Sequence, residues 1–213
     1  MTSEQTTNCV KMVALILLGS IFILRLMGQN WICPCGFVNV WYGKAGGPQT
    51  SQHLLDWYTF SHLIHGFLFY GLLSYYAPEM SLGKRLVLAL VIEACWEIVE
   101  NTPFVIDRYR ELTAAVEYQG DSILNSCSDM ISMIVGFGIA HRSRWVLIAL
   151  LTVSFEVFTL YFAKDSLALN VLMLLYPLES VRAWQTGMVL IGVTLPAVLQ
   201  GTSANDASDL RSP

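Results

Sequence analysis

The chain has 213 residues, of which 54% are hydrophobic and only 13% are charged, and its formal net charge at pH 7 is −4. A soluble domain of this length carries about twice that share of charged residues, so the composition excludes an ordinary soluble protein. The small net charge and the lack of a basic run give no reason to expect a nucleic-acid partner. The mean hydropathy of +0.53 and the long apolar runs instead predict an all-α integral membrane helical bundle.

The first apolar run follows a short N-terminal tail, residues 1–9, and could be taken for a secretory signal. It lacks a positive start and a small-x-small cleavage pattern, because the sequence MGQNWICPCG follows it. We therefore interpret it as a retained first helix. Four similar runs follow along the chain. The five predicted spans are residues 10–27, 57–77, 86–106, 121–140 and 145–163.

The chain after residue 164 has weaker signals. The run SLALNVLMLLYPLESVRAWQ has a short apolar core that ends at Pro177, and GMVLIGVTLPAVLQ is only about 14 residues long. This pattern fits a short sixth span within 166–200, or a re-entrant or interfacial helix, which gives five or six transmembrane helices. Residues 201–213 are predicted to be a disordered C-terminal tail. The positive charges near helix ends favour an N-terminus in the cytoplasm.

The third run contains three carboxylates, which are costly inside a membrane. Glu93, Glu97 and Glu100 follow i, i+4, i+7 spacing, so they share one helical face. Polar residues also occur at helical spacing in the two neighbouring runs. These residues are His62, His65, Asp121, Asn125 and Asp129.

The polar residues are predicted to meet, because successive spans run antiparallel and each residue of a helix rises about 1.5 Å. Trp57, Ile106 and Asp121 are the ends of the second, third and fourth predicted spans on one side of the membrane. The depth of each polar residue below these ends places the residues in two layers, each with one residue from each of the three helices. The upper layer is His62, Glu100 and Asn125, and the deeper layer is His65, Glu97 and Asp129. The pocket formed in this way lets the carboxylates satisfy one another.

One interpretation of the pocket is a site for a divalent metal such as zinc, iron or manganese, because imidazole and carboxylate groups suit these ions. In that hypothesis the protein is a hydrolase acting on a lipid or lipid-linked substrate, and Glu100 or Asp121 is the general base. The predicted metal ligands are His62, His65, Glu97 and Asp129.

Two other interpretations stay open. A transport or proton path would use the same carboxylates and would add Glu93 and Glu156, the latter from the fifth run. A structural or partner-binding network would only fix the packing of the helices. The residues do not decide whether the chain is an enzyme.

The remaining cysteines, histidines and glycines give weaker signals. Cys33 and Cys35 in WICPCG suit a metal, thiol exchange, a local disulfide or a plain tight turn, and the odd total of five cysteines argues against a disulfide framework. His53 and His141 are expected to be solvated or interfacial. The GFG motif at 136–138 is expected to allow close approach of two helices.

Five blocks of the sequence carry a family resemblance. They are WICPCGFVNVWYG, SHLIHGFLFYG, EACWEIVENTPFVIDRYR, GDSILNSCSDMISMIVGF and LNVLMLLYPLESVRAWQ. Together they resemble the bacterial UPF0314 family, also called DUF2585, over most of the chain as far as Trp184. The resemblance implies a multi-pass protein of the inner membrane with unknown function, so it supplies a location and no chemistry.

Two fainter similarities concern the fourth run. The stretch YQGDSILNSCSDM, Tyr118 to Met130, is similar to a run in the YjdF-like membrane proteins, which tend to carry an acidic residue where this chain has Asn125. The fourth predicted helix is also similar to a D…N…G helix of the VanZ-like proteins, at Asp121, Asn125 and the later Gly136. Neither family implies an established catalytic residue for this chain.

Overall fold

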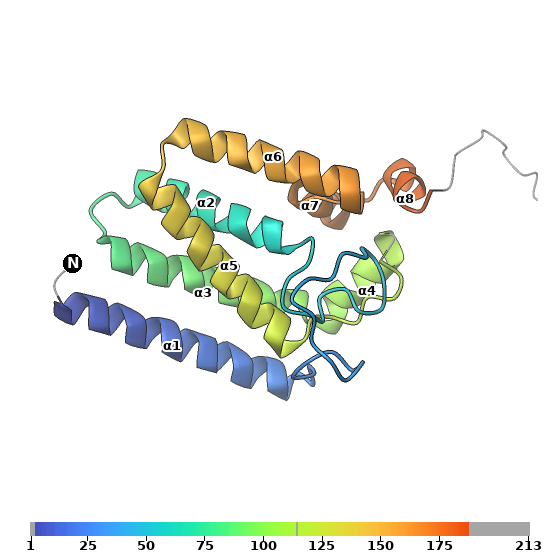
Figure 1. Cartoon of the computed structure of the whole chain (residues 1–213), viewed down its shortest axis with the longest axis horizontal. Helices are drawn as coiled ribbons and strands as arrows, with labels where there is room; N and C mark the ends of the chain where they lie inside the picture. Colours follow the sequence, from blue (N-terminus) through green and yellow to red (C-terminus); the bar gives the residue numbers. More distant parts are fainter. Residues whose placement is uncertain (1–2, 114, 188–213) are drawn as a thin grey trace, which may run out of the picture.

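The computed structural model describes residues 3–113 and 115–187, and within these ranges the chain forms helices and no β-strand. The long helices lie roughly side by side, and the short helices and the long loop between α1 and α2 gather at one end of the bundle (Figure 1). The helices are α1 (Ser3–Leu26), α2 (Thr59–Tyr76), α3 (Leu82–Glu100), α4 (Pro103–Leu112), α5 (Ile123–Arg142), α6 (Trp145–Ala163), α7 (Leu167–Leu175) and α8 (Glu179–Gln185).

Three of these helices, α1, α5 and α6, are long and apolar enough to cross a membrane. The apolar side chains of α1 and α6 are mostly exposed, as lipid-facing side chains are, whereas more than half of the corresponding window of α5 is buried within the protein. Helices α2 and α3 have similar lengths, 18 and 19 residues, and carry the predicted histidines and glutamates of the pocket. The structure therefore confirms an all-α bundle, and the count of five or six spans stays a prediction.

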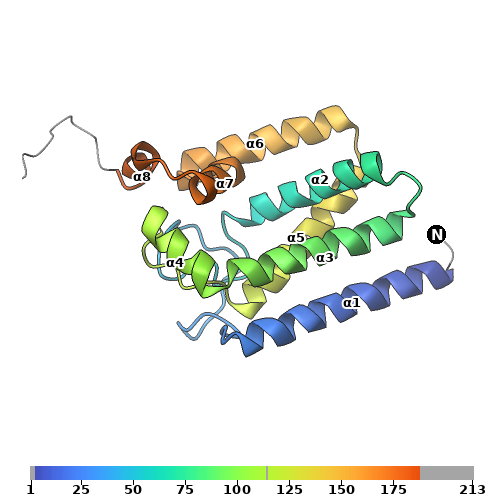
Figure 2. The ribbon, with the colours of Figure 1, turned by 180° about the vertical axis from the view of Figure 1, so that it is seen from behind.

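The centre of the bundle is the crossing of α2 and α5, which lie between α3 and α6 (Figures 1 and 2). A Cβ added at Gly66 of α2 would lie 2.2 Å from the carbonyl oxygen of Met133, and one at Gly136 of α5 would lie 2.2 Å from the carbonyl oxygen of Leu63. The two backbones are therefore in direct contact, which only glycine allows. The prediction of close approach is confirmed for Gly136. Gly138 lies on an open face instead.

The third predicted span, residues 86–106, is divided in the structure. Helix α3 ends at Glu100 and α4 begins at Pro103, with Thr102 in an extended conformation between them (φ −75°, ψ 148°). The reason is local, because a proline ring disfavours the helical conformation of the residue before it and is well suited to the first turn of a new helix. The end of the third helix therefore lies six residues earlier than the predicted end at Ile106.

The chain after α6 folds back as two short helices, α7 and α8, beside the loop end of the bundle (Figure 2). The break between them comes at Tyr176 and Pro177, where the sequence predicted the end of the apolar core. Neither helix has the length to span a bilayer. The rest of the predicted sixth span, from residue 188, and the predicted tail 201–213 lie outside the described residues.

Candidate functional site

A cluster of polar side chains lies inside the bundle between α2, α3 and α5, near the end that the loops cover. His62 is at its centre, with Nδ1 lying 2.6 Å from Glu93 Oε1 and 3.5 Å from Glu97 Oε1. On the other side of the ring, His62 Nε2 lies 3.8 Å from Asp129 Oδ2. His62, Glu93, Glu97 and Asp129 are all at most 5% exposed. We refer to these four residues together with His65 and Glu100 as the His62 cluster.

His65 joins the cluster through Glu93. Its Nδ1 lies 3.0 Å from Glu93 Oε2, so the one carboxylate receives hydrogen bonds from both imidazole rings. A ring that donates from Nδ1 leaves Nε2 unprotonated and free to accept a proton or bind a metal. In this arrangement Glu93 fixes the orientation of His62 and turns its Nε2 towards Asp129.

The pairing between layers differs from the prediction in one respect. The predicted layers matched His62 with Glu100 and His65 with Glu97, whereas the structure brings His62 to Glu97 and His65 to Glu93. The cause is the early end of α3 at Glu100, six residues before the predicted end, while α2 begins two residues after its predicted start at Trp57. The difference of four residues shifts α3 by about one turn relative to α2. Counted from the observed ends, His62 and Glu97 lie three residues inside their helices. Glu93 consequently belongs to the centre of the cluster.

Several atoms of the cluster have no hydrogen-bond partner within the described protein. The buried atoms without a hydrogen-bond partner include both carboxylate oxygens of Glu97 and Oδ1 of Asp129. Buried carboxylates left without a partner cost several kcal/mol, about 2–7 kcal/mol for a polar group in general. The cluster therefore offers donor atoms that the protein itself does not use.

The cluster fits a metal ion by the chemistry of its donors. His62, Glu97 and Glu100 can each direct one ligand atom into a group whose members lie within 4.8 Å of one another. His62, His65 and Glu93 form a second such group, but its atoms are already joined by hydrogen bonds. Imidazole nitrogen and carboxylate oxygen are ligands of zinc, iron and manganese. His62 and Glu97 of the first group, with Asp129 beside them, would hold the ion, and Glu100 lies next to these ligands.

Three predicted pocket residues lie outside this cluster. Asn125 donates from Nδ2 to the carbonyl oxygen of His53, 2.9 Å away, and so binds the loop between α1 and α2, which covers this end of the bundle. Glu156 of α6 accepts hydrogen bonds from the backbone N–H groups of Leu167 and Ala168, each at 3.1 Å. It therefore caps the first turn of α7 and does not reach the pocket, because an unpaired helix start attracts a carboxylate.

Asp121, the third of these, is held in a network of its own just before α5. Its oxygens accept hydrogen bonds from Asn101 Nδ2 at 3.0 Å and from the Tyr118 hydroxyl at 2.9 Å, while its N–H donates to Asn101 Oδ1 at 2.7 Å. Burial raises the pKa of Asp121 to about 6, and the hydrogen bonds from Tyr118 and Asn101 offset part of that rise. The network ties the end of α3 to the start of α5.

The loop between α1 and α2 covers this end of the bundle. Asn30 and Trp31 accept hydrogen bonds from the N–H groups of Ile123 and Leu124, at 2.8 and 3.1 Å, so carbonyl groups of the loop satisfy the first turn of α5. Ser122 caps the same helix, because its hydroxyl accepts from the N–H of Asn125 at 3.2 Å. The loop is thus fixed in place above the His62 cluster.

His53 organises the loop from inside, contrary to the prediction that it is solvated. It is 0% exposed. Its Nδ1 accepts from the N–H of Asn39 at 3.2 Å and its Nε2 lies 3.0 Å from Gln49 Oε1. Burial lowers its pKa, which favours the neutral ring that this pairing requires. His141 is exposed, as predicted.

Cys33 and Cys35 are joined by a disulfide, which is one of the alternatives that the sequence left open. The bridge closes the turn at the start of the covering loop. Because both sulfur atoms form the disulfide, the oxidised pair offers no thiolate for a metal ion.

Some residues that build the site were not predicted as functional. Asn101 and Tyr118 hold Asp121, and the only sequence signal for Asn101 is its place between a glutamate-rich helix and Pro103. Asp56 accepts hydrogen bonds from the N–H groups of Ser51 and Tyr58, at 2.9 and 2.8 Å. An aspartate just before a predicted helix is a recognised start signal, so Asp56 could have been found from the sequence.

The comparisons with known proteins agree with the resemblance. The family model described as "Protein of unknown function (DUF2585)" matches residues 24–187. A UPF0314 protein of Sphingopyxis alaskensis is 52% identical over 165 residues, which is 78% of this chain and 88% of the relative. UPF0314 proteins of Rhizobium etli and Paracoccus denitrificans are 50% and 47% identical, over 81% of this chain and 89% of each relative. No solved structure matches the chain.

Proposed function

The chain belongs to the DUF2585 (UPF0314) family, and from that premise we propose that it is a membrane protein that binds a divalent transition metal ion in the His62 cluster. The family description gives no chemistry, so the proposal depends on the geometry of the cluster. The observation that carries it is Glu97, which is 0% exposed and has neither of its oxygens paired. A cation among these carboxylates would offset the cost of burying them.

The metal interpretation accounts for the cluster better than a network that serves packing alone. In a packing network the buried polar groups are expected to satisfy one another. Here Glu93 is fully paired with the two histidines, while Glu97 and Asp129 are not. This division matches a metal site, in which Glu93 orients the imidazole and the unpaired carboxylates are ligands.

We infer that the ion serves a hydrolytic reaction on a lipid or lipid-linked substrate. A divalent ion of this kind supplies Lewis-acid chemistry. Of the two predicted general bases, Glu100 lies next to the proposed ligands His62 and Glu97 and is only partly buried, so it is the better placed to take a proton from water. Both oxygens of Asp121 are engaged by Asn101 and Tyr118. We assign Asp121 a positioning role between α3 and α5.

A transport or proton path is the competing function. That hypothesis required Glu156 and Glu93 to continue the chain of acidic groups towards the other face. Glu156 binds two backbone N–H groups of α7, which favours a structural role for it. The metal-dependent function therefore has more support from the arrangement of the residues.

We place the protein in the bacterial inner membrane as a multi-pass protein with its N-terminus in the cytoplasm. The long apolar helices and the relatives support a bacterial membrane protein. The disulfide in the covering loop supports an oxidising compartment at the opposite end from the N-terminus.

The test is elemental analysis of the detergent-purified protein after loading with zinc, iron or manganese and removal of free ions. We expect about one ion per chain in the wild type and a loss of the ion in His62→Ala and in Glu97→Gln. His141→Ala is the matched control, because His141 is exposed and far along α5 from Asp129. Equal metal content in the wild type and in both cluster variants would contradict the proposal.

A further inference from the structure

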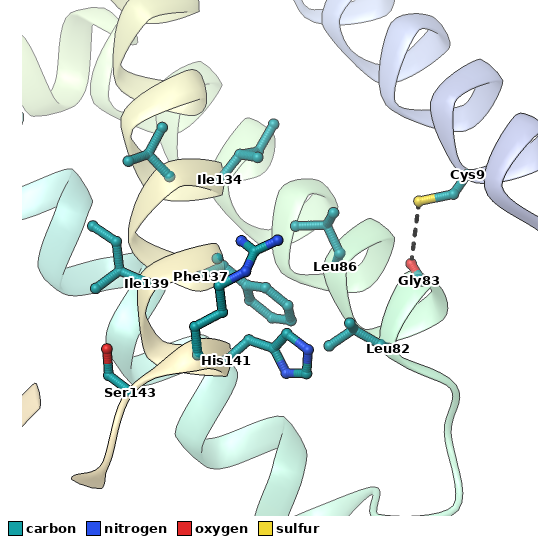
Figure 3. A pocket seen from close by; sticks show the side chains of 12 residues that line it. Cys9, Leu82, Gly83, Leu86, Ile134, Phe137, Ile139, His141 and Ser143 are labelled. Atoms are coloured by element: carbon teal, nitrogen blue, oxygen red, sulfur yellow. Dashed lines mark hydrogen bonds between the residues drawn. The ribbon is translucent and has the colours of Figure 1, made fainter. Parts of the chain in front are cut away.

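The opposite end of the bundle contains a cavity that the proposed metal site does not use. It lies where α1, α3 and α5 come together, near the N-terminus of the chain, and its volume is about 620 Å³. In Figure 3, Phe137 and His141 point towards Leu82 and Leu86 across this space. The walls are mostly aliphatic and aromatic, so the interior suits a hydrocarbon chain.

Helix α1 contributes a single residue, Cys9, to the lining of the cavity. Cys9 of α1 lies beside α3, and its Sγ is 3.8 Å from the carbonyl oxygen of Gly83 (Figure 3). On α5, a Cβ added at Gly138 would meet nothing within 4 Å except Arg142 Nη1, at 3.9 Å. The space beside Gly138 is therefore open, with only the guanidinium of Arg142 near it.

A cation without a partner lies at the rim of this cavity. Arg142 is one of the lining residues, and its guanidinium folds back over Gly138, one turn earlier on α5. Among the described residues it forms no hydrogen bond and no ion pair, whereas Arg85 nearby is engaged by Ser74 and Tyr70. A free guanidinium beside an apolar space is suited to a phosphate group, which it binds in a bidentate manner.

The charge of this end of the protein favours an anionic ligand. The end carries five basic residues against two acidic ones, Glu4 and Glu79, among the described residues. The basic residues are Lys11, Lys84, Arg85, Arg142 and Arg144. An excess of positive charge near the membrane surface attracts anionic headgroups.

We propose that this cavity binds an anionic phospholipid, with one acyl chain between α1 and α5 and its phosphate at Arg142. The apolar walls provide affinity for the acyl chain, and Arg142 provides selectivity for the headgroup. The site is separate from the His62 cluster, which lies at the end of the bundle that the loops cover.

The proposal is tested by native mass spectrometry of the detergent-purified protein titrated with phosphatidylglycerol and, separately, with phosphatidylcholine. The wild type is expected to bind phosphatidylglycerol about tenfold more tightly, the effect of one charge-assisted contact. In Arg142→Gln this preference is expected to disappear. Arg144→Gln removes the same charge from the same end without lining the cavity, and it is expected to keep the preference.

A second pair of variants tests the apolar part of the site. Gly138→Leu places a side chain in the open space, and it is expected to weaken the binding of both lipids. Gly71→Leu is the matched control, because Gly71 is also a helical glycine with nothing within 4 Å of an added Cβ, and it lies on α2 away from the cavity. Equal affinity of the wild type for the two lipids, an unchanged preference in Arg142→Gln, or unchanged binding in Gly138→Leu would each overturn the assignment.

Discussion

Gly66→Ala is predicted to separate the two central helices and to destabilise the protein. The added Cβ would lie 2.2 Å from Met133 O, 2.5 Å from Phe137 N and 2.8 Å from Gly136 C. Real Cβ atoms essentially never approach another atom to less than 3.0 Å, so α2 and α5 must move apart by at least about 0.8 Å. All three obstructing atoms belong to the backbone, and therefore no side-chain rotation relieves the contact.

The expected cost follows from this overpacking. Insertion of a methyl group into a closely packed interior costs about 1–3 kcal/mol. For a chain of this length 1 kcal/mol corresponds to about 2–4 °C in Tm, so a decrease of about 2–12 °C is expected. The movement would also lengthen the distance from His62 to Asp129, since His62 lies one turn before Gly66 on the same helix. Metal affinity is expected to fall with it.

The assay is the thermal unfolding of the detergent-purified protein, followed by tryptophan fluorescence. Gly71→Ala serves as the control, because an added Cβ meets nothing within 4 Å there. Alanine favours the helix relative to glycine by about 1 kcal/mol, so the Tm of this control should stay the same or rise. If Gly66→Ala unfolded at the same temperature as Gly71→Ala, the close contact of α2 and α5 would be refuted.

Two further substitutions test the assignment of the acidic residues outside the His62 cluster. Glu156→Ala removes the acceptor for two N–H groups of α7, so it should cost about 1 kcal/mol of stability while the metal content stays that of the wild type; loss of the metal would show that Glu156 belongs to the site. Asp121→Asn concerns pH dependence. The raised pKa of Asp121, about 6, means that its contribution to stability is fully present below the ordinary value near 3.8 and is lost as the pH rises through 6. The variant should therefore show a smaller decrease of Tm between pH 4 and pH 7 than the wild type, with a residual decrease from Asp165, whose pKa burial also raises to about 6. If Tm decreased between pH 4 and pH 7 by the same amount in Asp121→Asn and in the wild type, the raised pKa of Asp121 would be contradicted.

The bundle itself was predictable because bilayer thickness fixes the length of apolar helices. The fifth predicted span, residues 145–163, has the same limits as α6. The agreement is close because the ends of this helix coincide with the ends of its apolar run. The third span was predicted six residues too long, because an apolar run was counted through Thr102 and Pro103. Proline geometry acts over one or two residues, so hydropathy averaged over a window does not detect it.

The sequence predicted which histidines and glutamates lie close together, but it also put Asp121, Asn125 and Glu156 in the same pocket, and the structure places these three in other contacts. The i, i+4, i+7 spacing of Glu93, Glu97 and Glu100 was enough to place them on one face opposite the histidines. The partners of each histidine depended on the end of α3, so the central position of Glu93 was missed. The burial of His53 could not be predicted, because it results from a long loop folding over the start of α5, and no periodic pattern encodes such a contact.

The central claim, that the His62 cluster holds a divalent metal ion, is tested most directly by an anomalous difference map from crystals of the zinc-loaded protein. We expect a single strong peak between α2, α3 and α5, about 2.0–2.2 Å from a ring nitrogen of His62 and from a carboxylate oxygen of Glu97. A map with no peak at these residues, while exposed histidines such as His141 bind zinc, would contradict it.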